Sequence, residues 1–460
     1  MKRILWFRRD LRVEDNPLLS LEGEVLPIFI FDTNILSSLR ADDRRVAFIY
    51  HTLLTLKESL RQRNLDLALF YGKPSDVFQW LLAHGNYDEV CASGDYDRYA
   101  LERDRDISHL LPFHYIHDTY IFRPDEVLKN DGSPYLIFTP FYTRAKSLFT
   151  PEHMREYPPA VQQKSEFDYD FIHAIDQSRD TLSPIALESI GFYPRLLTEG
   201  QYDSPQKKLD RFAEKIDAYS QNRDYMALYG TSGLSTDLRF GTVSIRTVLR
   251  WMLEQKKRGT ETEPFFRQLV FREFYAMLLY HFPHLSEHNF RYPFEGIPNE
   301  EFYKAFCTAQ TGVPIVDAGI TELLKNGEMH NRVRMICASF FTKNLLLPWQ
   351  WGEAFFAEHL MDYDASSNIL SWQWSAGTGV DPQPYFRIFN PYTQASKFDR
   401  DGSYITRWLP QLSSLSPQTL FNEKALSEGI SSSYPLPIVD HKSSSQKALE
   451  YFKNASSIKL

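Results

Sequence analysis

The sequence predicts an α/β N-terminal domain built on a doubly wound parallel sheet, followed by a larger all-α domain. Short, nearly continuous apolar runs alternate with helix-like segments in the first part of the chain, which is typical of strands covered on both faces. From residue 206 the pattern is helical almost throughout. Between these parts the periodicity is lost. The expected organisation is a domain at 1–125, a connector at 126–205 and a helical domain at 206–460.

Composition is that of a soluble globular protein, with 43% apolar and 24% charged residues among 460. The sequence has no run of 18 apolar residues, so no membrane-spanning helix is expected. The apolar run at the N-terminus is too short for a secretory signal. Three scattered cysteines favour a reducing cytoplasm. The net charge of -8 neither requires nor excludes DNA, because nucleic-acid binding needs only a local basic face.

The elements follow from apolar spacing. Strands are expected at 3–7, 24–31, 65–71 and 87–92, and helices between them at 41–63, 74–84 and 96–111. No GxGxxG motif opens the first helix, so a standard dinucleotide grip is not expected. The proline-punctuated connector holds a short helix near 140–148. Later helices are expected at 206–219, 243–257, 264–280, 299–307, 314–326, 330–342, 350–361, 364–376 and 443–453.

Residues 229–239 place hydroxyl groups and glycines just before a helix. Free N–H groups at a helix start, with nearby hydroxyls, form an anion site suited to a pyrophosphate. The alternative is an ordinary N-cap formed by serine or threonine.

Two further stretches predict contacts with a flat ligand. Asn331, Arg334 and Met335 fall on one face of the helix at 330–342, where they suit an aromatic ligand with polar edges, although the face is alternatively a solvated one. Asp362 is expected to pair with Arg334. Trp372 and Trp374, two residues apart on a helix, point in different directions; the alternative is two core tryptophans. No histidine spacing predicts a metal site.

Several long motifs resemble the DNA photolyase and cryptochrome family, most closely its class I enzymes for cyclobutane pyrimidine dimers. They occur in the family's order along essentially the whole chain. They are Trp6–Arg12 with Asp15-Asn16-Pro17, then 231–235, 311–318, 329–332, Trp372-Gln373-Trp374, 386–391 and 434–441. The resemblance implies an α/β domain, a linker and a helical domain that binds FAD.

The same resemblance implies a light-driven carbon–carbon lyase, in which excited reduced FAD passes an electron to a dimer in damaged DNA. Asn368 would face flavin N5, with Arg334 and Asp362 beside the isoalloxazine. The implied cofactor-binding residues are Tyr219, Thr231, Ser232, Leu234, Ser235, Arg272, Arg334, Asp362, Asp364 and Asn368. The chain would act as a monomer.

The implied lesion pocket departs from the family pattern at two positions. Relatives hold Glu and Trp where this chain has Gln268 and Phe271, whereas Asn331, Met335 and Trp374 match. Glutamine at the first position also occurs in enzymes for (6-4) photoproducts, but those carry paired histidines at 330–331. Cyclobutane dimers are therefore the expected substrate; the alternatives are (6-4) photoproducts and a cryptochrome-type blue-light receptor.

The implied tryptophan chain that reduces the flavin is incomplete. Trp372 and Trp349 match its first two members, but the outermost place holds Phe306, which is too hard to oxidise. Tyr303, one helical turn away, is a possible substitute. Light-driven flavin reduction is therefore expected to be weaker than in relatives with three tryptophans. Glu328 stands where a Trp is usual, without explanation.

An antenna pigment is also implied. Residues 96–106 resemble a folate-contacting segment, with Glu102 in the pterin-binding place. Methenyltetrahydrofolate or a deazaflavin would fit this role. The alternative is an exposed, charged helix start.

Overall fold

The structure, a computed structural model, describes residues 1–175, 186–193, 200–429 and 434–456. Contacts divide the chain into two compact units that interleave along the sequence. The first comprises Met1–Pro134, Tyr142–Arg211 and Ser232–His281, and the second comprises Tyr135–Phe141, Phe212–Thr231 and Phe282–Leu460. The consecutive domains expected at 1–125, 126–205 and 206–460 stay a prediction.

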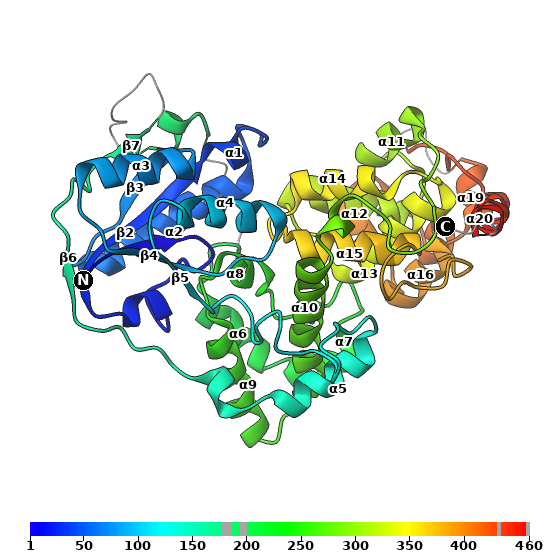
Figure 1. The fold of residues 1–460 in the computed structure, drawn as a ribbon. Coiled ribbons are helices and arrows are strands. Elements are labelled where there is room, and N and C mark those ends of the chain that lie inside the picture. The colour runs from blue at the N-terminus through cyan, green and yellow to red at the C-terminus, as the bar shows by residue number, and fades with distance from the viewer. Residues whose placement is uncertain (176–185, 194–199, 430–433, 457–460) are drawn as a thin grey trace. The chain divides into compact units, whose positions relative to one another are not determined.

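A parallel sheet forms the centre of the first unit (Figure 1). Its order is β5-β4-β1-β2-β3-β7, and β6 pairs with the start of β2. The chain moves outward from β1 in both directions, so the sheet is doubly wound as expected, with its switch point between β1 and β4. The strands are β1 (Lys2–Phe7), β2 (Gly23–Asp32), β3 (Ala68–Gly72), β4 (Glu89–Ser93), β5 (Phe113–Ile116), β6 (Gln162–Lys164) and β7 (Ile172–Ala174).

Burial explains why the predicted strands form. In β2 every residue from Val25 to Asp32 is buried, as expected where both faces of a parallel strand are covered. One cover is α3 (Pro74–His84), whose Phe78 meets Trp6 of β1 edge to face at 5.1 Å. The other helices of the first unit are α1 (Thr33–Leu36), α2 (Arg44–Arg61), α4 (Arg98–Ser108), α8 (Ser235–Phe240), α9 (Ile245–Lys257) and α10 (Glu263–His281).

The connector contributes more than the sequence predicts. Its short helix is present as α5 (Phe138–Leu148), but β6 and β7 also come from the connector and extend the sheet. Each is only three residues long, too short to show a periodic pattern. Residues 176–185 and 194–199 of the predicted connector lie outside the described residues. A further helix, α6 (Pro205–Ala213), follows the connector.

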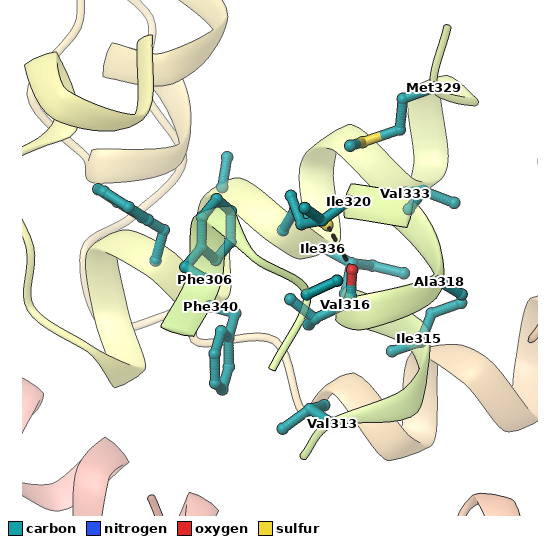
Figure 2. Packing of buried hydrophobic residues seen from close by; sticks show 14 of the residues in the cluster. Phe306, Val313, Ile315, Val316, Ala318, Ile320, Met329, Val333, Ile336 and Phe340 are labelled. Atoms are coloured by element: carbon teal, nitrogen blue, oxygen red, sulfur yellow. Dashed lines mark hydrogen bonds between the residues drawn. The ribbon is translucent and has the colours of Figure 1, made fainter. Parts of the chain in front are cut away.

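Among the described residues of the second unit, the regular secondary structure consists of helices. Its core includes Phe306 and side chains of α12 and α13, which Figure 2 shows from close by. Gly319 brings these two helices together, because a Cβ there would lie 2.4 Å from Val333. The helices are α7 (Tyr219–Asn222), α11 (Glu300–Cys307), α12 (Pro314–Asn326), α13 (Asn331–Ser339), α14 (Trp349–His359), α15 (Ala365–Ala376), α16 (Pro391–Phe398), α17 (Ser403–Trp408), α18 (Pro417–Leu420), α19 (Glu423–Ser427) and α20 (His441–Ser456).

Every helix within the described ranges is too short or too polar to span a bilayer.

Candidate functional site

The predicted pair of Arg334 and Asp362 is present in the second unit. Nη2 of Arg334 lies 3.0 Å from each carboxylate oxygen of Asp362, and its Nε donates to the Met329 carbonyl at 2.8 Å. The Arg334 side chain is 29% exposed and that of Asp362 is 11% exposed. The guanidinium is therefore held in one orientation while part of it stays accessible.

Asn368 makes a contact that the sequence did not predict. Its Nδ2 donates to the Glu353 carbonyl at 3.1 Å and to Glu353 Oε1 at 2.9 Å. Burial raises the pKa of Glu353, and the hydrogen bond from Asn368 offsets part of that rise. In the sequence, the signal for this contact is Glu353 itself. Its carboxylate comes four residues after Trp349 and lies between Gly352 and Phe355 among apolar neighbours.

Asp364, expected to bind the cofactor, caps the helix that carries Asn368. Its carboxylate accepts from the Ser367 backbone N–H at 3.1 Å and from the Ser366 hydroxyl at 2.5 Å. Because these bonds fix the start of α15, Asp364 positions Asn368 in the structure.

The two tryptophans of α15 have different surroundings, as predicted. Trp372 is 2% exposed and packs edge to face against Phe341 and Phe356, with ring centroids at 5.4 and 4.9 Å. Gly352 makes room for it, since a Cβ there would lie 2.2 Å from the indole. Trp374 is only half-buried. Trp349, the neighbour of Trp372 in the implied electron chain, is buried too.

Trp349 has a defined partner of its own, because its Nε1 donates to Asn289 Oδ1 at 2.7 Å. Phe306 is fully buried against Phe341 and Phe355. The structure therefore does not place Phe306 at the solvent-facing end that the resemblance implies. Tyr303 is partly exposed and lies edge to face with Trp351, with centroids 5.2 Å apart.

Asn331 and Met335 share one side of α13, as predicted. Nδ2 of Asn331 lies 3.7 Å from the Met335 sulfur. His330 caps this helix by accepting from the Arg332 N–H through Nδ1 at 3.1 Å. Burial lowers the pKa of His330 to about 4, so the ring is neutral near pH 7. Glu328 is exposed, and nothing in the structure explains why it replaces a Trp.

The hydroxyl-rich stretch at 229–239 itself contains α8, a helix that the sequence did not predict, and the helix expected at 243–257 follows it as α9. The N-cap residue of α8 is the buried Leu234, and within the described ranges no side chain caps the helix. Ser232 Oγ accepts from the Leu234 N–H at 3.4 Å, whereas Thr231 and Ser235 are exposed. Tyr219, also predicted to bind the cofactor, is buried in the second unit against Phe212.

Helix α10 carries three predicted residues in the first unit. Gln268 and Phe271 are partly exposed. Arg272 donates through Nη1 to the Thr119 carbonyl at 2.9 Å and through Nη2 to the Leu238 carbonyl at 3.3 Å. Its guanidinium therefore ties α10 to α8 and to the segment after β5.

Glu102, the predicted antenna contact, lies on α4. Its side chain is 51% exposed and pairs with Arg98 one turn earlier at 3.0 Å. This geometry fits the alternative interpretation, an exposed and charged helix start.

Comparison with known proteins accounts for both parts of the chain. Residues 3–162 match a family model described as DNA photolyase, and residues 265–454 match the FAD binding domain of DNA photolyase. A deoxyribodipyrimidine photo-lyase from Alkalihalophilus pseudofirmus is 34% identical over 481 residues, which cover 98% of each chain.

Two solved structures share the fold over nearly the whole chain. A class III photolyase from Agrobacterium tumefaciens superposes with a TM-score of 0.85 at 30% identity, covering 99% of this chain and 98% of that one. An archaeal photolyase from Sulfolobus tokodaii, described with two FAD molecules, gives a TM-score of 0.82 at 28% identity and covers 99% of this chain and 100% of that one. Motifs, fold and full-length similarity agree, and the chain therefore belongs to the DNA photolyase family.

Proposed function

We propose that this protein repairs cyclobutane pyrimidine dimers in DNA, using light and bound FAD. The observation that carries the proposal is similarity to a deoxyribodipyrimidine photo-lyase along 98% of both chains. The protein would be a carbon–carbon lyase that acts on damaged DNA.

The side chains of the second unit fit the edges of a flavin. A flavin ring presents carbonyl oxygens and ring nitrogens, which need hydrogen-bond donors and acceptors in one plane. Arg334 supplies a guanidinium, Asn368 an amide and Trp372 an indole N–H that is buried without a hydrogen-bond partner among the described residues. When bound, reduced FAD would supply the electron that opens the cyclobutane ring and is then recovered.

The chain's own residues would bind the cofactor and control protons near it. We assign Arg334 and Asp362 to the isoalloxazine, and Asn368 to flavin N5. Glu353, whose pKa is raised, would hold or release a proton beside the Asn368 amide. The remaining cofactor-binding residues proposed are Tyr219, Thr231, Ser232, Leu234, Ser235, Arg272 and Asp364.

Lesion recognition would combine hydrogen bonding with stacking. A flipped dimer presents Watson–Crick edges and flat faces. We assign the edges to the amides of Gln268 and Asn331, and the faces to Phe271, Met335 and Trp374.

Replacing Asn368 by leucine should raise the pKa of Glu353 further, because burial already raises it and the main donor to its carboxylate is lost. Infrared titration of the carboxyl C=O band would measure the shift. Tyr363→Phe is the matched control, since Tyr363 donates to the same oxygen at a longer 3.4 Å and its loss should have a smaller effect. An unchanged pKa of Glu353 in the leucine variant would contradict the hydrogen bond from Asn368 to the Glu353 carboxylate.

The repair activity is tested with one oligonucleotide in three forms: with a cyclobutane dimer, with a (6-4) photoproduct and undamaged. The reduced protein is mixed with each form in the dark and under blue light. Light-dependent loss of the cyclobutane dimer alone is the expected result. Loss of only the (6-4) photoproduct would reassign the substrate, and no light-dependent change in any form would favour a receptor.

We further propose a monomeric, cytoplasmic protein. Three scattered cysteines without a CxxC pair favour a reducing compartment. An antenna pigment, either methenyltetrahydrofolate or a deazaflavin, also remains a proposal. Near-ultraviolet absorbance of the purified protein distinguishes these two pigments from each other and from a protein without an antenna.

A further inference from the structure

A buried lysine lies beside the end of the helix that carries Trp372 and Trp374. Lys343 belongs to the π-helix η6 (Phe340–Asn344), which follows α13, and its exposed fraction is 0%. A lysine is rarely buried to this extent unless it is paired, and short π-helical segments often occur at functional sites. The contacts of Lys343 therefore need an explanation beyond filling the core.

The lysine links three segments of the second unit. Its Nζ donates to the carbonyl of Ala376, the last residue of α15, at 3.0 Å and to the carbonyl of Tyr385 at 3.2 Å. The same atom lies 4.1 Å from the centre of the Phe452 ring, on α20. Gly377 leaves room for the amino group, since a Cβ there would lie 3.2 Å from Nζ. Lys343 thus joins the end of α15 to the segment that follows it and to α20.

The end of α15 depends on partners from outside the helix, because the last carbonyl groups of a helix have no partner within it. The carbonyl groups of Trp374 and Ser375 accept from the backbone and side-chain N–H groups of Gln383, each at 3.3 Å. The Ala376 carbonyl accepts from Lys343. A cation at this position also faces the negative end of the helix dipole. The turn that carries Trp374 is therefore held at its end by Lys343.

We infer that Lys343 is a positioning residue for Trp374, because it fixes the last turn of α15 so that the indole meets the dimer in one orientation. Trp374 is only half-buried, so its own packing restrains it less than that of a core residue. Trp372 is restrained by its contacts with two phenylalanine rings and should not depend on the lysine. The inference rests on the proposed function, which makes the dimer the ligand of Trp374.

The charge on Lys343 should change close to neutral pH. Burial lowers the pKa of Lys343 from 10.5 to about 7. A charged amino group donates stronger hydrogen bonds than a neutral one, so the end of α15 should loosen as the pH rises through this pKa. The titratable residues of the adjoining apolar cluster are Tyr385 and Tyr451. His441 of α20 bonds to the neighbouring Asn344, and burial lowers the pKa of His441 below its ordinary value, so that it is uncharged where Lys343 titrates.

Fluorine NMR follows Trp374 directly. The eight tryptophans are replaced by 5-fluorotryptophan in the FAD-bound protein, which is kept in the dark, and Trp372→Phe and Trp374→Phe identify the two resonances. In Lys343→Met, which has no donor, the Trp374 resonance should shift and broaden while that of Trp372 stays in place. Lys57→Met is the matched control, because Lys57 is also buried and donates to two backbone carbonyls, but in the first unit. It should leave the Trp374 resonance unchanged.

The pH profile of this resonance separates positioning from a general loosening of the fold. In the wild-type protein the Trp374 resonance should move towards its position in Lys343→Met as the pH rises through about 7, and the variant should lack this transition. Phe452→Leu keeps the lysine but removes the ring that favours its charged form, so the transition should move to lower pH. This second variant decides the question even if Lys343→Met does not fold. A transition that is unchanged in the variants, or equal shifts of the Trp372 and Trp374 resonances, would overturn the inference.

Binding of DNA in the dark connects the position of Trp374 with the lesion. Lys343→Met should weaken binding of a dimer-containing oligonucleotide about tenfold, a loss expected when a hydrogen bond from a charged group is removed. Binding of the undamaged oligonucleotide should not change, and an equal loss for both, or none, would refute the role in lesion binding. If the wild-type protein neither prefers nor repairs dimers, the proposed function fails, whereas the fluorine resonances still decide whether Lys343 positions Trp374.

Discussion

Replacing Asp118 by alanine should lower the free energy of unfolding by about 3–5 kcal/mol, the usual cost of removing one partner from a buried ion pair. Asp118 Oδ1 lies 2.6 Å from Nη2 of both Arg12 and Arg246 in the first unit. All three residues are buried. Without the carboxylate, two guanidinium groups remain close together and away from water. Urea unfolding followed by circular dichroism measures the loss.

The matched control is Asp42→Ala. Asp42 pairs with Arg40 at 2.9 Å, but the side chains of Arg40 and Asp42 are 56% and 42% exposed, so this loss should stay within about 1 kcal/mol. Similar losses in the free energy of unfolding for Asp118→Ala and Asp42→Ala would show that burial does not determine how much the Asp118 ion pairs stabilise the fold.

The same cluster predicts the sign of a pH effect. Burial alone would raise the pKa of Asp118, but the guanidinium groups of Arg12 and Arg246 outweigh it and lower that pKa below its ordinary value. The carboxylate therefore stabilises the fold fully above the pKa of aspartate in the unfolded chain. This contribution is lost as the pH falls through the lowered pKa of the folded state, and Asp118→Ala should flatten that part of the acid-unfolding curve.

Trp372→Phe should slow light-driven reduction of the flavin by about tenfold or more, which corresponds to at least about 1.4 kcal/mol in the effective barrier. Trp372 is the first implied electron carrier, and phenylalanine is much harder to oxidise. The edge-to-face contacts with Phe341 and Phe356 favour an aromatic replacement, so the fold should survive. Absorbance of oxidised FAD under blue light with an external reductant measures the rate.

Trp374→Phe is the control, because it changes the same residue type two positions away on α15. It should leave flavin reduction intact and weaken lesion binding. Chemically reduced Trp372→Phe should still repair dimers, since repair does not need the tryptophan chain. Equal loss of flavin reduction in both variants would contradict the division of roles between the two tryptophans.

Elements with strong local signals were predictable from the sequence. The bounds expected for α3 and α12 match the structure, because each begins with a proline in its first turn and α12 ends at Gly327, which has a φ of 72°. Strands β5, β6 and β7 were missed, since three or four residues carry too little pattern. Their formation depends on partners far along the chain.

The same limit applies to the candidate site. The pair of Arg334 and Asp362 could be expected, because a guanidinium and a carboxylate occur on stretches already linked to a ligand. The Glu353–Asn368 contact could not, because it depends on how α14 and α15 cross. The burial of Phe306 could not be predicted either, because helical spacing does not tell which side of α11 faces the core.

The two strands that the connector adds to the sheet have a consequence for synthesis and for truncation. β6 pairs with the start of β2 and β7 with β3, so the α/β fold is incomplete until the ribosome has passed residue 174. A fragment that stops at residue 125 would leave one side of β3 unpaired, and an open strand edge of this kind promotes association between chains. A separately expressed N-terminal half should therefore extend past β7.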